Sequence, residues 1–215
     1  MASKKTGIIL GLAAFSFVAL SSCGGMFGKG GADSTAIKQE LEKALTENTD
    51  LITVDSAGYS MNIPKHMSKT SELNDDASLQ YQDAAKELYV ICIDEAKTDF
   101  IKTFSDADLD PKFTKYDDKL TPEKNYRLIQ MEIMKGKMTL KSEPAVKKAT
   151  INGLDAEIVD FTAKVDGIDY DIYYKLAFIE GTKNMYMVMT WTLDSDKNSN
   201  MDEMDQMLNS FKLKK

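Results

Sequence analysis

Alternating apolar and polar residues predict most of the strands of this chain. The clearest alternation runs from residue 159 to residue 193 and is interrupted at Asp166-Gly167 and at residues 180–183. A period of two turns one face of a strand toward a core, and Asp-Gly is a common hairpin turn. The predicted inward positions are Val159, Phe161, Ala163 and Val165; Ile168, Tyr170, Ile172, Tyr174, Leu176 and Phe178; and Met185, Met187, Met189, Trp191 and Leu193. We therefore expect an antiparallel meander over residues 159–193.

Three shorter strands are predicted ahead of this meander. Residues 59–63 alternate and stop at Pro64, and residues 79–81 form a short strand. Residues 88–93 are apolar at almost every position, which is typical of a strand with packed layers on both sides. We expect residues 88–93 to form a central strand.

Apolar residues at helical spacing predict three helices in the same region. The first covers residues 97–104, and the second starts after Thr121, with Pro122 at its first position, and ends near Gly136. A closing helix is predicted to bury Met204, Met207, Leu208 and Phe211. Strands and helices in this order predict an α+β fold, an antiparallel β-sheet flanked by helices, in one domain over residues 51–215.

Two segments of this domain resemble the PsbP-like family, also known as the Mog/PsbP fold. Ala57-Gly58-Tyr59-Ser60-Met61-Asn62-Ile63-Pro64 resembles the family's first strand. The segment from Ala177-Phe178-Ile179-Glu180-Gly181 to Ser210-Phe211-Lys212 resembles its hairpin and closing helix. The resemblance covers approximately residues 52–213. It implies a sheet between helices, and a binding or assembly role in place of catalysis.

Residues 1–22 are typical of a bacterial signal peptide. Lys4 and Lys5 precede an uncharged, mostly apolar run over residues 8–20, which is too short to span a bilayer. Leu20-Ser21-Ser22-Cys23 resembles the lipobox of bacterial lipoproteins. This resemblance implies cleavage before Cys23 and attachment of lipid to its thiol and new amine. An ordinary secreted protein and a weak N-terminal anchor are the alternatives.

The segment that follows Cys23 predicts a tether and a helix. Residues 23–33 are rich in glycine, which favours a flexible coil. Residues 34–50 are predicted to form an amphipathic helix, with apolar residues Ile37, Leu41, Ala44 and Leu45. We expect this helix to pack on the domain; the alternative is that it binds a partner. The absence of acidic residues directly after Cys23 favours the periplasmic side of the cell envelope.

The charge of the chain excludes nucleic acid as a partner. The formal charge is −7, and removing residues 1–22, which hold two lysines and no acid, lowers it to −9. Nucleic-acid binding needs clustered Lys and Arg to contact phosphates. The predicted partners are therefore the membrane, through the N-terminal lipid, and a protein of the envelope.

One oxygen-rich segment is a candidate calcium site. The spacing of its carboxylates and amides resembles that of an EF-hand loop: Asp194, Asp196, Asn198, Asn200, Asp202 and Asp205. However, Ser199 stands where glycine makes the sharp turn, and Asp205 replaces the longer glutamate. The same residues also fit a turn in which Asn200 is a helix N-cap and Glu203 completes a capping box.

Other candidates for chemistry have simpler structural interpretations. Cys92 is predicted to be a buried thiol, His66 a surface loop residue, and the methionines at 185, 187 and 189 a core face, although thioethers can bind Cu(I). Two acidic groups, Asp106, Asp108 and Asp110 and Asp166, Asp169 and Asp171, could supply the carboxylates of a hydrolase but suit solvated turns. We therefore predict a non-catalytic, lipid-anchored binding or assembly protein without a cofactor. A small-ligand or calcium-binding protein is the alternative, and an envelope hydrolase is less favoured.

Overall fold

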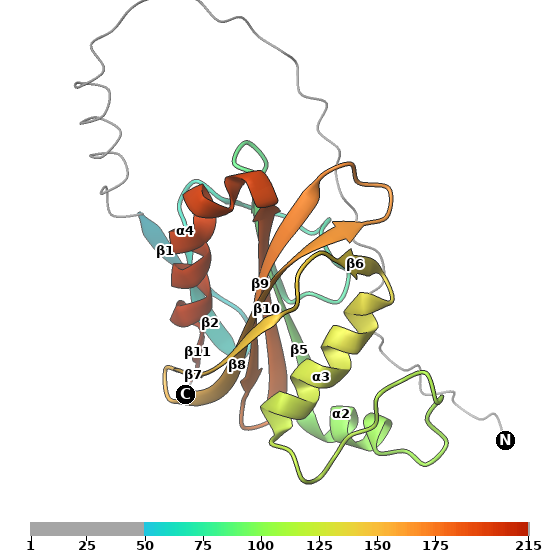
Figure 1. Cartoon of the computed structure of the whole chain (residues 1–215). Coiled ribbons are helices and arrows are strands. Elements are labelled where there is room, and N and C mark those ends of the chain that lie inside the picture. Colours follow the sequence, from blue (N-terminus) through green and yellow to red (C-terminus); the bar gives the residue numbers. More distant parts are fainter. Residues whose placement is uncertain (1–49, 215) are drawn as a thin grey trace, which may run out of the picture.

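The computed structural model describes residues 50–214, which form two β-sheets and three α-helices (Figure 1). The predicted signal peptide, Cys23 and the predicted tether lie outside the described residues, as does the predicted helix apart from Asp50. No helix within the described range is long and apolar enough to cross a membrane.

The larger sheet is antiparallel and forms the centre of the molecule. Its strands are, in spatial order, β3 (Ser68–Lys69), β4 (Leu79–Asp83), β5 (Leu88–Ala96), β10 (Asn184–Leu193), β9 (Asp171–Glu180), β8 (Leu154–Val165) and β6 (Met138–Leu140). A further strand, β7 (Ala145–Ile151), pairs with β8 on the same side as β6. Leu176 of β9 lies opposite Val159 on one side and Met189 on the other, so the predicted meander is confirmed.

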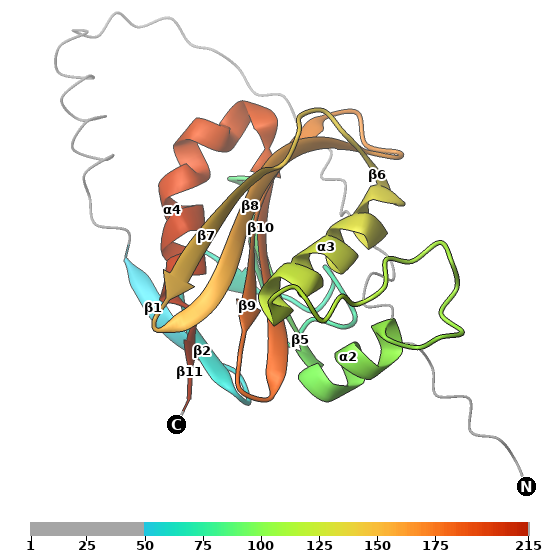
Figure 2. The same ribbon diagram turned by 60° about the horizontal axis from the view of Figure 1, so that its bottom comes forward.

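One face of this sheet is covered by α2 (Lys97–Phe104) and α3 (Pro122–Lys135), which lie together on one side in Figures 1 and 2. The predicted start of α3 is confirmed, with Thr121 at the N-cap and Pro122 as the first helical residue. The inward alternate residues of β8, β9 and β10 pack here with both helices in one apolar cluster. This cluster includes Val159, Phe161, Leu176, Phe178, Met187 and Met189.

The opposite face is covered by α4 (Lys197–Ser210) and a smaller sheet of β1 (Leu51–Asp55), β2 (Tyr59–Pro64) and β11 (Lys212–Leu213). A short 3₁₀ turn, η1 (Asp194–Asp196), connects β10 to α4. Met204, Met207 and Leu208 of α4 pack with Cys92 and Val188 of the larger sheet in a second apolar cluster. The predicted α+β fold, a sheet with helices on its faces, is therefore confirmed.

Two sequence predictions about element boundaries are wrong. Tyr170 was predicted to face the core, but β9 begins at Asp171, and Tyr170 is 66% exposed. The Asp166-Gly167 turn is closed by the Ile168 N–H, which donates to the Val165 carbonyl at 3.1 Å, and residues 168–170 leave the sheet there. Asn200 was predicted to be an N-cap, but α4 already begins at Lys197, so Asn200 lies inside the helix.

Candidate binding surface

Among the large apolar side chains that are exposed within residues 50–214, the most exposed one lies at the end of the β8–β9 hairpin. We call residues 166–170 the hairpin tip. Gly167 has a φ of +82°, a left-handed conformation that glycine adopts without strain, and this conformation turns the chain. Ile168 packs against the apolar cluster and anchors the tip, whereas Tyr170 points to solvent. The hairpin extends beyond the helices at the upper right of Figure 1.

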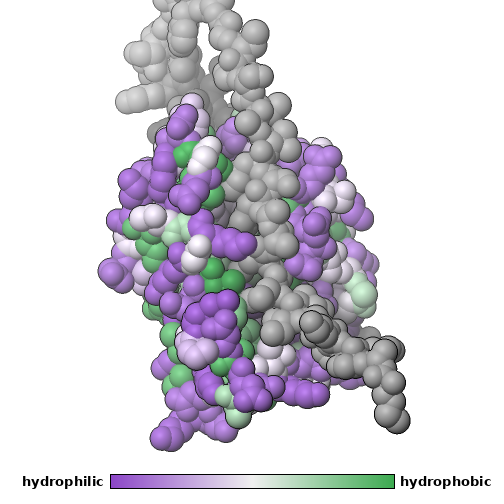
Figure 3. Space-filling view, turned by 90° about the vertical axis from the view of Figure 1, so that its right-hand side faces the viewer, coloured by the Kyte–Doolittle hydropathy of each residue, from purple (hydrophilic) through white to green (hydrophobic). Residues whose placement is uncertain are grey.

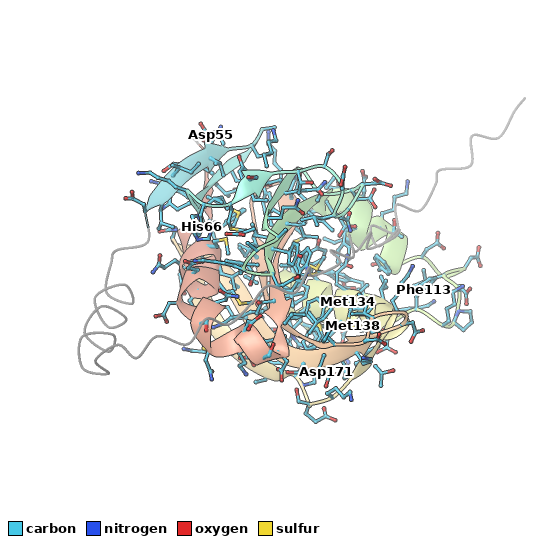
Figure 4. All side chains as sticks on the ribbon, turned by 90° about the horizontal axis from the view of Figure 1, so that it is seen from above. Asp55, His66, Phe113, Met134, Met138 and Asp171 are labelled. Carbon is cyan, nitrogen blue, oxygen red and sulfur yellow. The ribbon has the colours of Figure 1, made fainter. Side chains whose placement is uncertain are left out.

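Carboxylates surround Tyr170 on the hairpin tip. Asp166 and Asp169 are exposed, and Asp171, the first residue of β9, is half-buried. The Nζ of Lys141 lies 3.6 Å from Oδ1 of Asp171, and Lys164 lies opposite Asp171 in the strand register. Asp171 lies on the side of the molecule away from His66 (Figure 4). The described residues visible in Figure 3 are mostly hydrophilic, with smaller hydrophobic areas between them. The tip therefore presents one aromatic ring within a negatively charged, solvated surface.

A second exposed feature runs along the same strand, β8. One side of strand β7 pairs with β8, and no strand among the described residues pairs with the other side of β7 (Figure 2). Val146 of β7 is 46% exposed, and Lys147 and Lys148 are also exposed. We call β7 the open edge. The hairpin tip thus lies at one end of β8, and the open edge pairs with the part of β8 nearer its other end.

His66 lies in a surface turn, as predicted, but it takes part in a charged network. Its Nδ1 is 2.8 Å from Asp83 Oδ2, and its Nε2 is 3.2 Å from Glu203 Oε1. Lys86 Nζ donates to the same Glu203 oxygen at 3.1 Å. The network connects the turn after β2, where His66 lies (Figure 4), to the end of β4 and to α4.

Three of the six residues of the candidate calcium segment are engaged by side chains or carbonyls elsewhere in the domain. Asp194 Oδ1 accepts a hydrogen bond from Thr162 at 2.8 Å, and the carboxylate of Asp205 pairs with Lys175. Asn200 is buried, and its Nδ2 donates to the Lys86 carbonyl and to Thr192 Oγ1. Within residues 50–214, no group of three or more His, Cys, Asp or Glu side chains is placed to hold a metal ion. The structure therefore adds no support to the calcium site that the sequence spacing suggests.

The remaining candidates occupy the places that the simpler interpretations predict. Cys92 is fully buried, and burial raises the pKa of its thiol well above the usual value. The methionines at 185, 187 and 189 are fully buried in the sheet core. Asp106 and Asp110 are exposed, and each accepts a hydrogen bond from a backbone N–H two residues further along the chain.

Two polar contacts that sequence reasoning missed lie under α3. Arg127 of α3 forms an ion pair with Glu157 of β8, whose side chain is 4% exposed. Gln130, one turn along the helix, donates to Glu95 Oε2 of β5 at 2.7 Å. Burial raises the pKa of the Glu95 carboxyl. The only available sequence signal was a charged residue on a helix that otherwise has an apolar face.

No protein-family model matches the chain, and no curated protein matches its sequence. Several solved structures are similar in fold. The solution structure of cyanobacterial PsbP from Synechocystis sp. PCC 6803 has 12% sequence identity to this chain and a TM-score of 0.48. The match covers 91% of this chain and 99% of the PsbP chain. The Saccharomyces cerevisiae Ran-binding protein Mog1p has 11% identity and a TM-score of 0.45, and covers 77% of this chain and 96% of its own.

A third similar structure is LpqN of Mycobacterium tuberculosis, which is described as involved in cell envelope biogenesis. It has 10% identity and a TM-score of 0.46, and covers 81% of this chain and 97% of its own. The similar structures thus include proteins of the PsbP-like and Mog group that the sequence resembles. The likeness is one of fold.

Proposed function

We propose that this chain is a non-catalytic, lipid-anchored protein of the bacterial cell envelope that binds another envelope protein through its hairpin tip. The signal pattern and the lipobox-like residues before Cys23 support the lipid anchor and its periplasm-facing location. Lipid would then hold the domain at the membrane, while the domain itself contacts the partner.

The observation that carries the binding role is the exposure of Tyr170. A tyrosine that is 66% exposed at the end of a projecting hairpin has a large apolar area open to a partner. Tyrosine is among the residues that most often dominate the binding energy of interfaces, because its ring is large and loses little conformational freedom. The carboxylates of Asp166 and Asp169 favour a partner surface that carries Lys or Arg.

Site-specific photo-crosslinking in cells tests this proposal. A photoreactive phenylalanine derivative at position 170 should crosslink to one protein of defined mass, which mass spectrometry would identify. The same derivative at position 52, where Ile52 is exposed on β1 of the smaller sheet, is the matched control and should not produce that product.

Affinity for the identified protein provides the second measurement. Tyr170→Ala should weaken binding about 30-fold, the loss that corresponds to about 2 kcal/mol for a dominant interface residue. Ile52→Ala, which also truncates an exposed side chain, should leave binding to the tip unchanged. Equal crosslinking from positions 170 and 52, or no effect of Tyr170→Ala, would contradict the proposal.

A further inference from the structure

Among residues 50–214, the open edge of the larger sheet has unpaired backbone groups and two lysines that form no ion pair. Strand β7 is seven residues long, and only its side toward β8 is paired among the described residues. Neither Lys147 nor Lys148 forms an ion pair with a described residue. Glu157, which lies opposite Lys148 in the register, pairs with Arg127. Such an edge can accept one more strand through main-chain hydrogen bonds.

The two lysines decide which strand the edge can accept. Neighbouring residues of a strand point to opposite faces, so Lys147 and Lys148 place one positive charge on each face of the sheet. Full antiparallel overlap of β7 with a second copy would set the two Lys148 side chains directly opposite each other, which is destabilising. Lysine on an edge strand generally prevents such self-association. The edge therefore disfavours its own copy and favours a strand with acidic residues at the facing positions.

We infer that β7 is an augmentation site for an extended segment of a partner protein that carries two adjacent acidic residues. The added strand would pair with the free side of β7, and its acidic residues would lie opposite Lys148 and Lys147. The exposed side chain of Val146 supplies an apolar contact beside them. This inference rests on the proposed function for the existence of a protein partner, but it concerns a different surface from Tyr170.

Binding of a defined peptide to the purified full chain tests the inference. The probe is the blocked peptide Thr-Thr-Val-Glu-Glu-Val-Thr, which in full antiparallel overlap places its glutamates opposite Lys148 and Lys147. We expect saturable binding, with slower hydrogen exchange of the β7 amides and unchanged exchange in β1, the edge strand of the smaller sheet.

Charge reversal provides the decisive comparison. Lys147→Glu/Lys148→Glu should weaken binding of this peptide by at least about tenfold, since two favourable cross-strand pairs become repulsive. A peptide with Lys-Lys in place of Glu-Glu should bind this variant better than the native chain. The matched control is Lys69→Glu/Lys183→Glu, which makes the same change in net charge at two exposed lysines away from β7.

Three outcomes would overturn the inference: no binding of the glutamate peptide, equal binding of both peptides, or protection outside β7. Each leaves crosslinking at position 170 unaffected, so its failure is distinguishable from failure of the proposed function. Unchanged thermal unfolding of the charge-reversal variant would show that it folds.

Discussion

Arg127 and Glu157 form an ion pair that is removed from water between α3 and β8. Deleting one member leaves the other charge buried without a partner, and such changes typically cost about 3–5 kcal/mol. We therefore expect Arg127→Met to lower the free energy of unfolding by about that amount, measured by urea denaturation. The double variant Arg127→Met/Glu157→Leu should recover most of the loss. A loss of unfolding free energy below about 1 kcal/mol for the single variant would contradict the presence of a buried ion pair between Arg127 and Glu157.

Glu95 predicts a dependence of stability on pH. Burial raises the pKa of its carboxyl above the usual glutamate value of about 4.3, so the folded chain holds this proton more tightly than the unfolded chain does. As pH rises from about 4 through the raised pKa, the native chain should lose stability relative to Glu95→Gln, which cannot ionise. Urea denaturation at a series of pH values measures the difference. Parallel stability curves for the two proteins would contradict the prediction.

At the scale of single residues, periodicity predicted burial well wherever a strand continued. The alternate residues Met185, Met187 and Met189 are buried as predicted, because each strand of the meander has a packed layer on that face. Tyr170 was misplaced because the turn uses more residues than the alternation suggests. The pairing of Arg127 with Glu157 depends on how α3 crosses β8, which local sequence does not determine.

At the scale of elements, the start of α4 was the least predictable feature. A run of Asp, Asn and Ser is typical of a turn, and the sequence accordingly predicted a capping box at Asn200. The chain is helical there from Lys197, and the buried amide of Asn200 bonds to Thr192 of β10 and to the carbonyl of Lys86 in the turn before β5. Local sequence does not reveal these distant partners. Strands β1 and β7 were not predicted, since most of their side chains are exposed and show no alternation in burial.

The start of α4 also bears on the calcium prediction. Asp194, Asn200 and Asp205 are already engaged by Thr162, Thr192 and Lys175, so binding calcium would require breaking these contacts. We expect millimolar calcium to leave the thermal unfolding temperature unchanged, measured against an equal concentration of magnesium. A calcium-specific rise that disappears in Asp196→Asn would contradict this expectation and restore the loop as a site.

At the scale of the whole molecule, the proposed lipid anchor would separate membrane attachment from the proposed binding. The described domain has apolar clusters on both faces of its larger sheet and helices that cover them, and the proposed lipid at Cys23 would supply the attachment. We expect Cys23→Ala to move the chain from the membrane fraction to the soluble fraction on cell lysis. Native-like thermal unfolding of the released chain would be the control for folding. Retention of Cys23→Ala in the lipid fraction would contradict lipidation at this position.

The place of β10 in the larger sheet has a consequence for the order of folding. In space, this strand lies between β5 and β9. In the sequence, it is the last strand of the larger sheet, so Cys92 of β5 pairs with the distant Val188 of β10. Such distant pairing is slow, because a long loop must close before any contact forms. The two halves of the sheet cannot join until residues 184–193 have been synthesised. Under the proposed export, a chain built this way would stay open until its end has nearly emerged, which suits passage through a translocation channel that admits only unfolded protein.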